Sequence, residues 1–358
     1  MKIFFDHQIF SHQKIGGVSK YFAKLLSHLP QGSWSTSTVF SENQYVKELN
    51  LFPTIQLPGP EFKGKGRLRL ELGIPYTVWQ LSRQKYDVYH QTHYELFSLW
   101  GIGKKPMVTT IHDMNFFTYN INKRLQRDTI KSCERADHII AISESTKNEL
   151  VDLLKIDEKK ISVIYHGIDH IKLDSIPNVH IYDFPYILYV GNRNNPFKNF
   201  NNFIKAFSLL SEKNSEIRLV CTGAPFNDQE QKLLEALKIS NRCHSIFASE
   251  MQMIQLYRNA LFFVYPSISE GFGMPILEAM QCGCPCILSN VSCFPEIGQN
   301  AAMYFNPHSV DNIYEVMNQA CQNESILRKL TNDGFQRVQF FSWEKTAAKH
   351  YSLYQSLI

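Results

Sequence analysis

The sequence predicts an α/β protein made of two domains, each a parallel, doubly wound sheet covered by helices. Its 358 residues are enough for two domains of ordinary size. Short apolar runs alternate with helical patterns along the chain, which is typical of parallel βαβ units. A polar stretch that carries prolines, residues 169–185, separates two such series and is interpreted as a linker. We therefore expect a first domain over residues 1–170 and a second over residues 183–341.

Composition and charge indicate a soluble globular protein. Hydrophobic residues make up 44% of the chain and charged residues 20%, which predicts a substantial core. The formal net charge of +4 is small and no long basic run is present, so no nucleic acid is expected as a partner. The start of the chain, Met1–Asp6, turns polar after three apolar residues, which predicts a strand and not a signal peptide. No stretch approaches eighteen apolar residues, so we expect a cytoplasmic protein without membrane spans.

In the first domain, strand candidates follow one another at intervals that leave room for helices. The first strand candidate is Lys2–Asp6, and apolar residues at helical spacing follow it from Val18 to Leu29. Ser143 or Ser145 is expected to cap a helix that runs to Leu154. The later strand candidates are Thr36–Phe40, Asp87–His90, Met107–Ile111, His138–Ile142 and Ile161–Tyr165.

The second domain repeats this alternation. It begins with the strand Tyr186–Gly191, and a final helix from about Ser342 to Leu357 follows it at the end of the chain. Helices are predicted at about 200–211, 228–237 and 251–259, and strands at 217–222, 244–247, 261–265 and 285–289.

Residues 269–280 are the most informative stretch, because they place two carboxylates around a loop-to-helix junction. The run reads Ser-Glu-Gly-Phe-Gly-Met-Pro-Ile-Leu-Glu-Ala-Met. Gly271 and Gly273 let a ligand approach the main chain closely, and Pro275 suits the first turn of a helix. Glu270 is therefore expected on the loop and Glu278 early in the helix. Both would lie at the carboxyl end of a parallel strand, where open α/β sheets bind ligands.

The chemistry of this junction favours a ligand that carries both phosphate and hydroxyl groups. The free N–H groups and partial positive charge of a helix start suit a phosphate. Carboxylates beside an anion site make electrostatic sense when they accept hydrogen bonds from hydroxyls. A sugar nucleotide supplies a diphosphate for the amides and hydroxyls for the carboxylates. The alternative is that the acids only stabilise the start of the helix.

This stretch resembles the acidic signature of retaining glycosyltransferases of family 4, which have the GT-B fold. In that family two glutamates with seven residues between them flank the donor site, and Glu270 and Glu278 have this spacing. The resemblance implies that Gly271, Phe272 and Gly273 belong to the donor site. It also implies two Rossmann-like domains that face each other across a cleft, the first binding the acceptor and the second binding the nucleotide sugar. The final helix, residues 342–358, would pack back on the first domain.

Two cations, Arg193 and Lys198, lie on the loop after the first strand of the second domain. Two positive charges at the carboxyl end of that strand would bind a pyrophosphate through charge-assisted hydrogen bonds. The run Val-Gly-Asn-Arg-x-x-x-x-Lys-Asn resembles the family's pair of cations, which neutralise the leaving diphosphate without a divalent metal. The expectation is therefore no metal and no cofactor, with a GDP-sugar or UDP-sugar as the donor. The alternative is a pair of surface cations.

Two motifs of the first domain are candidate site residues by the same resemblance. Gly16 and Gly17 open a helix and resemble the family's glycine-rich loop, although two adjacent glycines alone indicate only a tight loop. His112 follows the strand Met107–Ile111 and matches a histidine that contacts the donor sugar in the family. Its alternative is a structural histidine. His90 and His93 face the acceptor side or pack in a loop.

A basic strip and a group of cysteines complete the candidate features. Lys63, Lys65, Arg67 and Arg69 alternate with leucines, and they form either a solvated face or a contact with anionic lipid headgroups on the inner membrane face. Four of the eight cysteines fall between positions 282 and 293, but their spacing does not fit a zinc site. We expect reduced, mostly buried cysteines.

The combined prediction is a retaining glycosyltransferase. It would move a hexose, with a slight preference for mannose, to a glycan or lipid-linked acceptor in the synthesis of a surface polysaccharide such as lipopolysaccharide. Glu270, His112, Arg193 and Lys198 are the predicted catalytic residues, and Glu278 would bind the ribose hydroxyls. The alternatives are a sugar-nucleotide 2-epimerase of the same fold and a non-catalytic protein that binds sugar nucleotides. The missing Gly-x-Gly-x-x-Gly run disfavours a nicotinamide oxidoreductase.

Overall fold

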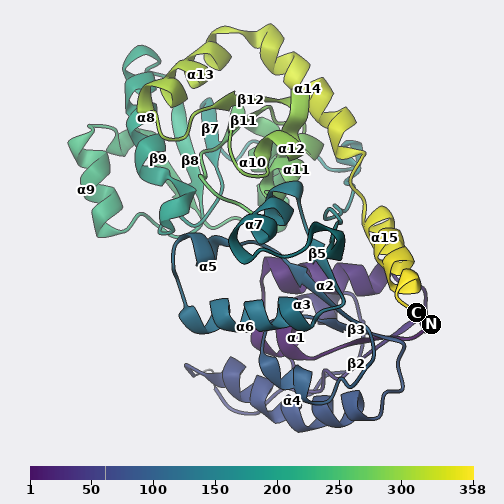
Figure 1. The fold of residues 1–358 in the computed structure, drawn as a ribbon. Coiled ribbons are helices and arrows are strands. Elements are labelled where there is room, and N and C mark those ends of the chain that lie inside the picture. Colours follow the sequence, from purple (N-terminus) through teal and green to yellow (C-terminus); the bar gives the residue numbers. More distant parts are fainter. Residues whose placement is uncertain (61) are drawn as a thin grey trace. The chain divides into compact units, whose positions relative to one another are not determined.

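A computed structural model describes residues 1–60 and 62–358, and these form two compact units (Figure 1). The first unit comprises Met1–Gly167 and Ser342–Ile358, and the second comprises Ile168–Phe341. The stretch interpreted as a linker belongs to the second unit. There the Gln255 side chain donates a hydrogen bond to the Pro177 carbonyl at 2.8 Å, and Arg258 donates one to the Ile176 carbonyl at 2.7 Å.

The first unit is a six-stranded parallel sheet in the order β2-β1-β3-β4-β5-β6. The order reverses between β1 and β3, which makes the carboxyl ends of these two strands the switch point of this sheet. The strands are β1 (Ile3–Phe5), β2 (Trp34–Thr36), β3 (Val88–Gln91), β4 (Met107–Ile111), β5 (His138–Ala141) and β6 (Ile161–Val163).

Helices cover both faces of this sheet, as the alternation of its strand residues requires. Ile3 and Phe5 pack in one buried cluster, and Phe4, which lies between them, packs in the other. The helices are α1 (Gln8–His12), α2 (Gly17–His28), α3 (Gln44–Glu48), α4 (Lys65–Ser82), α5 (Asn115–Thr118), α6 (Lys123–Arg135), α7 (Glu144–Leu154) and α15 (Trp343–Ser356).

Helix α15 packs against α2 within the first unit. Tyr21 and His350 are joined by a 2.7 Å hydrogen bond between the hydroxyl and Nε2. His90 and Tyr354 are joined by a 2.6 Å hydrogen bond between Nδ1 and the hydroxyl. Figure 1 shows the N- and C-termini side by side at the end of this unit. The last helix therefore packs into the hydrophobic core of the first unit, although it lies at the other end of the sequence.

The second unit is another six-stranded parallel sheet, in the order β12-β11-β10-β7-β8-β9. Its switch point lies between β7 and β10. The strands are β7 (Tyr186–Tyr189), β8 (Arg218–Thr222), β9 (Cys243–Ile246), β10 (Phe262–Tyr265), β11 (Cys286–Ser289) and β12 (Ala302–Phe305). The helices are α8 (Phe200–Lys213), α9 (Asp228–Ala236), α10 (Glu250–Asn259), α11 (Met274–Gln281), α12 (Phe294–Gly298), α13 (Val310–Gln322) and α14 (Glu324–Val338).

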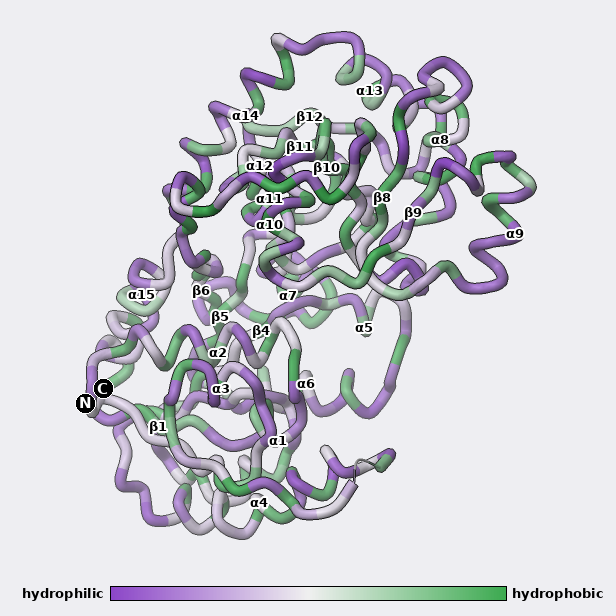
Figure 2. The backbone as a smooth tube through the Cα atoms, turned by 180° about the vertical axis from the view of Figure 1, so that it is seen from behind, coloured by the Kyte–Doolittle hydropathy of each residue, from purple (hydrophilic) through white to green (hydrophobic). Residues whose placement is uncertain are grey.

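Burial follows the hydropathy of the chain. In Figure 2 the strands β8 and β10 are largely hydrophobic, whereas α9 is mostly hydrophilic. All eight cysteines are free thiols, seven of them buried, and Cys321 is partly exposed. In the part of the chain that the structure describes, each helix is too short or too polar to cross a bilayer.

Some predicted elements are wrong. Strand β2 covers Trp34–Thr36 and not Thr36–Phe40, and Phe40 makes only an isolated bridge with Ile55. Helix α4 is not predicted by the apolar pattern, which shows only an alternating basic strip at its start. The reason is that its buried positions include Lys65 and Arg69, which interrupt the apolar period of the helix. The predicted cap of α7 is confirmed, because the Ser143 hydroxyl accepts a 3.1 Å hydrogen bond from the Thr146 N–H.

Candidate functional site

The loop between β10 and α11 has the geometry that residues 269–280 predicted. The chain leaves β10 at Tyr265, and Gly273, with φ of 84°, occupies the left-handed region before α11 begins. A Cβ atom at Gly273 would lie 3.0 Å from Ile276 and 3.1 Å from Phe294, so the glycine is required by both its backbone angle and its neighbours. Glu270 is on this loop, and Glu278 follows in the second turn of the helix.

A lysine and a glutamate meet at the carboxyl ends of β7 and β10. The Lys198 Nζ donates a hydrogen bond to the Glu270 Oε1 at 2.6 Å and another to the Tyr265 hydroxyl at 3.1 Å. The side chains of Lys198 and Glu270 are each 14% exposed, so the pair is largely desolvated but still reachable. Because β7 and β10 are neighbours at the switch point, this cluster lies where such sheets bind ligands.

The Ser292 side chain holds the main chain of Glu270. The Ser292 hydroxyl donates a 2.7 Å hydrogen bond to the Glu270 carbonyl, and the Glu270 N–H donates one back to Ser292 at 3.2 Å. The carboxylate therefore sits on a loop whose backbone is fixed. Such preorganisation is what an electrostatic catalytic site needs.

Two buried tyrosines surround Lys198. Burial raises the pKa of Tyr265 well above its ordinary value, and the neighbouring Glu270 raises it further, so the phenol stays neutral. Burial also raises the pKa of Tyr189 well above its ordinary value. The Tyr189 hydroxyl is buried and makes no hydrogen bond within residues 1–60 and 62–358. An unpaired buried hydroxyl beside the lysine leaves a polar contact open to a bound group.

Glu278 has different partners from Glu270. The Tyr257 hydroxyl, from α10, donates a hydrogen bond to the Glu278 Oε2 at 3.3 Å. Burial raises the pKa of Tyr257 well above its ordinary value, with a smaller contribution from Glu278. Phe272 is buried against Phe341, with ring centroids 5.9 Å apart, and it fixes the loop between the two acids. The two glutamates therefore project from one junction into two neighbouring environments.

Arg193, the other predicted cation, has different partners from Lys198. Its Nε lies 2.8 Å from the Glu230 Oε1. Its other nitrogens donate to the carbonyls of Thr222, Ala224 and Pro225. Glu230 is the third residue of α9 and also closes the capping box with Asn227. Arg193 thus ties the β7–α8 loop to the start of α9. No local pattern predicts this partner, because Glu230 lies 37 positions away in the chain.

In the first unit, Gly16 and Gly17 begin α2. A Cβ atom at Gly16 would lie 2.3 Å from the Gln13 Oε1, and that oxygen accepts a hydrogen bond from the Ser19 N–H at 3.2 Å. Gly17 has open space around its Cα. Gln13 thus satisfies one of the free N–H groups of this helix start, which supports the local role of the glycine pair.

His112, which is partly exposed, lies beside a group of buried imidazoles that the sequence did not predict. Its ring meets the Tyr21 ring edge-on at 4.8 Å and the His166 ring at 5.9 Å. Its Nε2 is buried and makes no hydrogen bond within the described residues. Burial lowers the pKa of His112 well below its ordinary value, and that of His90 likewise. Burial also lowers the pKa of His350 to about 4, so these imidazoles are neutral at pH 7.

The predicted basic strip does not form one face. Lys65 and Arg69 are buried and pair with Glu42 at 3.5 and 3.0 Å. A hydrogen bond from Lys14 and the nearby cations lower the pKa of Glu42 to about 2. Arg67 pairs with Glu71 and Glu95. The alternating pattern was a mixture of buried and exposed positions of one helix.

Two family models match the chain. The model described as "Glycosyltransferase Family 4" matches residues 15–172, and the model described as "Glycosyl transferases group 1" matches residues 174–337. The boundary between these matches lies close to the boundary between the two units.

Several bacterial proteins resemble the chain in sequence. It is 28% identical to the O-antigen chain mannosyltransferase B of Escherichia coli over 300 residues, which cover 78% of this chain and 77% of that protein. It is 33% identical to the O-antigen chain mannosyltransferase RfbU of Salmonella typhimurium, over 55% of this chain and 56% of the relative. It is 32% identical to the serotype-specific mannosyltransferase WbdA of Escherichia coli, over 66% of this chain but only 30% of the relative.

Solved structures resemble the chain over nearly its whole length. Anabaena Alr3699/HepE in complex with UDP and glucose has a TM-score of 0.75 and 18% identity, with 99% of this chain and 100% of that one covered. A glycosyltransferase from Rickettsia africae ESF-5 has a TM-score of 0.74 and 18% identity, with 99% and 98% covered. Together with the two parallel sheets, these likenesses confirm the predicted fold class of two doubly wound α/β domains.

Proposed function

Because the chain is a glycosyltransferase with the GT-B fold, we propose that it transfers a hexose, preferably mannose, from a nucleoside diphosphate sugar to a growing glycan or its lipid-linked precursor. The preference for mannose is supported by three relatives that are named as mannosyltransferases. Two of them are named for the O-antigen chain, which supports a role in the synthesis of a surface polysaccharide. The donor class is supported by a structural neighbour that is in complex with UDP-glucose.

The observation that carries the proposal is the 2.6 Å contact between Lys198 and Glu270 at the switch point of the second sheet. In a sugar nucleotide the reacting bond joins the sugar to the diphosphate. A cation at this position suits the diphosphate, and an acid that accepts hydrogen bonds from hydroxyls suits the sugar. We assign Lys198 to the leaving diphosphate, together with the backbone of Gly271 and Gly273. Glu270 is assigned to the hydroxyls of the transferred sugar, and Glu278 to those of the ribose.

We propose the retaining mechanism of family 4 for the reaction. The bond between the anomeric carbon and the diphosphate oxygen breaks while the acceptor oxygen bonds to the same face of that carbon. The proton of the acceptor hydroxyl leaves with the diphosphate. Lys198 stabilises the charge that grows on the leaving oxygen, which is the electrostatic contribution that enzymes use most. No metal and no cofactor is assigned to the reaction.

Three residues of the first unit keep the roles that the family resemblance implies. His112 is proposed to contact the donor sugar, and its neutral imidazole suits a hydrogen bond with a hydroxyl better than a charge on a phosphate. The helix start at Gly16 and Gly17 is proposed to accept part of the donor or acceptor. Arg193 is given a structural role instead of a catalytic one, because Glu230 and three carbonyls occupy its guanidinium.

We also propose that this cytoplasmic enzyme meets the anionic inner face of the membrane through α4. Leu68, Leu72, Tyr76 and Trp79 are all exposed, and their spacing places them on one face of this helix. Aromatic side chains with a polar edge favour the headgroup region, and the exposed Arg83, 4.7 Å from the Trp79 ring, adds a positive charge there.

A vesicle assay tests this surface. We expect sedimentation with vesicles that contain phosphatidylglycerol, and loss of it when Leu72 and Trp79 are both replaced by Ala. Leu153→Ala, which changes an exposed leucine on α7, is the control and should bind like wild type. Equal binding by all three proteins would exclude α4.

The transfer reaction is tested with the purified full chain and GDP-mannose or UDP-glucose. Release of free GDP or UDP, and transfer to an added α-mannoside, are measured in parallel. We expect Glu270→Gln to lose most transfer while the nucleotide still raises the melting temperature. Interconversion of epimeric sugar nucleotides would instead support an epimerase, and nucleotide binding without turnover would support a non-catalytic binding protein.

A further inference from the structure

A cavity of about 530 Å³ lies in the second unit, between the β7–α8 loop and the start of α9. Its volume is within the range of small-molecule sites. It is separate from the Lys198–Glu270 contact, since neither of those residues lines it, but the loop that forms one wall continues directly to Lys198. The lining residues are Arg193, Asn194, Asn195, Pro196, Asn199, Phe200, Asn201, Asn227, Gln229, Glu230 and Leu233.

The charges in this wall are already paired. Arg193 and Glu230 are 4% and 10% exposed, and the guanidinium Nε lies 2.8 Å from the carboxylate. The carboxylate also accepts the Asn227 N–H at 2.8 Å. No net charge is therefore offered to an anion by this pair, and breaking it to bind a phosphate would leave a buried carboxylate uncompensated. The cavity suits a neutral ligand.

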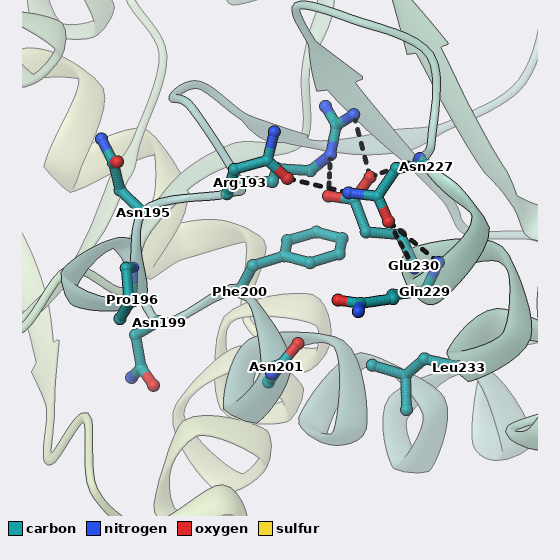
Figure 3. A pocket seen from close by; sticks show the side chains of 11 residues that line it. Arg193, Asn195, Pro196, Asn199, Phe200, Asn201, Asn227, Gln229, Glu230 and Leu233 are labelled. Atoms are coloured by element: carbon teal, nitrogen blue, oxygen red, sulfur yellow. Dashed lines mark hydrogen bonds and ion pairs between the residues drawn. The ribbon is translucent and has the colours of Figure 1, made fainter.

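Amide side chains dominate the rest of the lining. Among the described residues, the side chains of Asn195, Asn201 and Gln229 lie in this wall without an intramolecular hydrogen bond. Figure 3 shows the Gln229 and Asn201 amides directed toward the space beside the Phe200 ring. Each amide offers both donors and an acceptor, which match the hydroxyls of a sugar. Leu233, which is partly exposed, supplies an apolar contact for the C–H face of a pyranose ring, whereas Phe200 is only 3% exposed and forms the floor of the cavity.

We propose that this cavity is a subsite for a neutral, hydroxyl-rich oligosaccharide, and that it holds inner residues of the acceptor glycan. The inference rests on the proposed function, which requires a glycan acceptor. Asn195 precedes Lys198 by three residues, so the cavity and the proposed transfer site share the β7–α8 loop. The subsite would let the enzyme favour longer acceptors over single sugars.

The subsite is tested by calorimetric titration of the full chain with α-mannotriose and, separately, maltotriose and chitotriose. Wild type should bind at least one of the three saturably. Gln229→Ala and Asn201→Ala should each weaken that binding at least tenfold. The matched control is Gln231→Ala, two positions along α9, whose amide bonds to Glu235 outside the cavity. Melting temperatures confirm that each variant is folded.

A donor assay separates this inference from the proposed function. Cleavage of the sugar nucleotide should be unchanged in Gln229→Ala, whereas KM should rise for a trisaccharide acceptor and stay constant for a monosaccharide. Equal trisaccharide binding by wild type and both cavity variants, or no saturable binding by wild type, would overturn the subsite while leaving donor cleavage intact. If the wild-type protein itself does not cleave the sugar nucleotide, the proposed function is overturned instead.

Discussion

Polar residues lie at the carboxyl ends of the strands in both sheets, but their charge states differ between the two units. In the second unit the charged side chains are kept as ion pairs, such as Lys198 with Glu270 and Arg193 with Glu230. In the first unit the corresponding region holds His112 and its neighbouring imidazoles, which burial keeps neutral. A charge costs much to bury alone, so it persists only where a partner compensates it.

Within the second unit, the two ion pairs show that a shared loop does not imply a shared role. Lys198 and Glu270 are each 14% exposed, and beside Lys198 lies the unpaired hydroxyl of Tyr189. Arg193 and Glu230 are more buried, and backbone carbonyls take up the remaining guanidinium nitrogens. The first pair can exchange its partner for a ligand, whereas the second pair is committed to holding the loop on α9.

The largest effect is expected from Lys198→Ala. Removing the cation that we assign to the leaving diphosphate should lower the rate of transfer about 10²–10³-fold, which is typical of losing a preorganised donor. Stability should fall as well, but less than for Arg193→Ala, because the unpaired Glu270 is 14% exposed and Glu230 is 10% exposed. The measurement is the initial rate of nucleotide release at saturating donor, together with the melting temperature.

Arg193→Ala should lower the stability of the protein more than it affects the donor site. Leaving Glu230 buried without its partner should cost about 3 kcal/mol of unfolding free energy, which urea denaturation measures. Replacing both residues together, by Arg193→Met and Glu230→Gln, should recover part of that loss. The affinity for free GDP or UDP should stay within a few-fold of wild type. A large loss of nucleotide affinity in a stable Arg193→Lys variant would return Arg193 to the diphosphate site.

The sequence was sufficient for the fold and for the Glu270 loop, because both depend on local signals. Alternating apolar runs identify the strands, and Gly273 and Pro275 mark the helix start whatever surrounds them. The partners of Arg193 and Lys65 were not predictable in the same way. Glu230 and Glu42 are reached only through tertiary folding, and a charged residue at a buried position looks identical in sequence to an exposed one.

The histidines of the first unit predict a loss of stability in acid. The pKa of His350 is lowered from 6.5 to about 4 by burial, so the unfolded chain takes up the proton first as the pH falls. Its contribution is intact above pH 6.5 and is lost between about pH 6.5 and 4, with a slope of about 1.4 kcal/mol per pH unit. His166, with a pKa lowered to about 3, should act in the same direction.

Asp6 opposes this trend. Burial raises its pKa from 3.8 to about 6, so the folded state binds that proton more tightly and gains stability as the pH falls.

Urea denaturation of wild type and His350→Asn at pH 7, 6 and 5 isolates the contribution of the histidine. The variant should lose stability less steeply than wild type below pH 6.5. Parallel curves for the two proteins would mean that His350 does not titrate as a buried neutral group.

The smallest effect, and a test of how Glu270 and Glu278 divide the donor, is expected from Tyr265→Phe. This change removes the hydroxyl that accepts a 3.1 Å hydrogen bond from the Lys198 Nζ. It keeps the ring, whose centroid is 5.1 Å from that nitrogen. Lys198 would keep Glu270, so a net loss of one hydrogen bond, about 1 kcal/mol, should lower kcat roughly fivefold with little change in KM. Tyr257→Phe is the matched control, because it removes a hydroxyl from Glu278 and should act mainly on donor KM. Identical kinetics for both variants would mean that the two glutamates do not divide the donor as proposed.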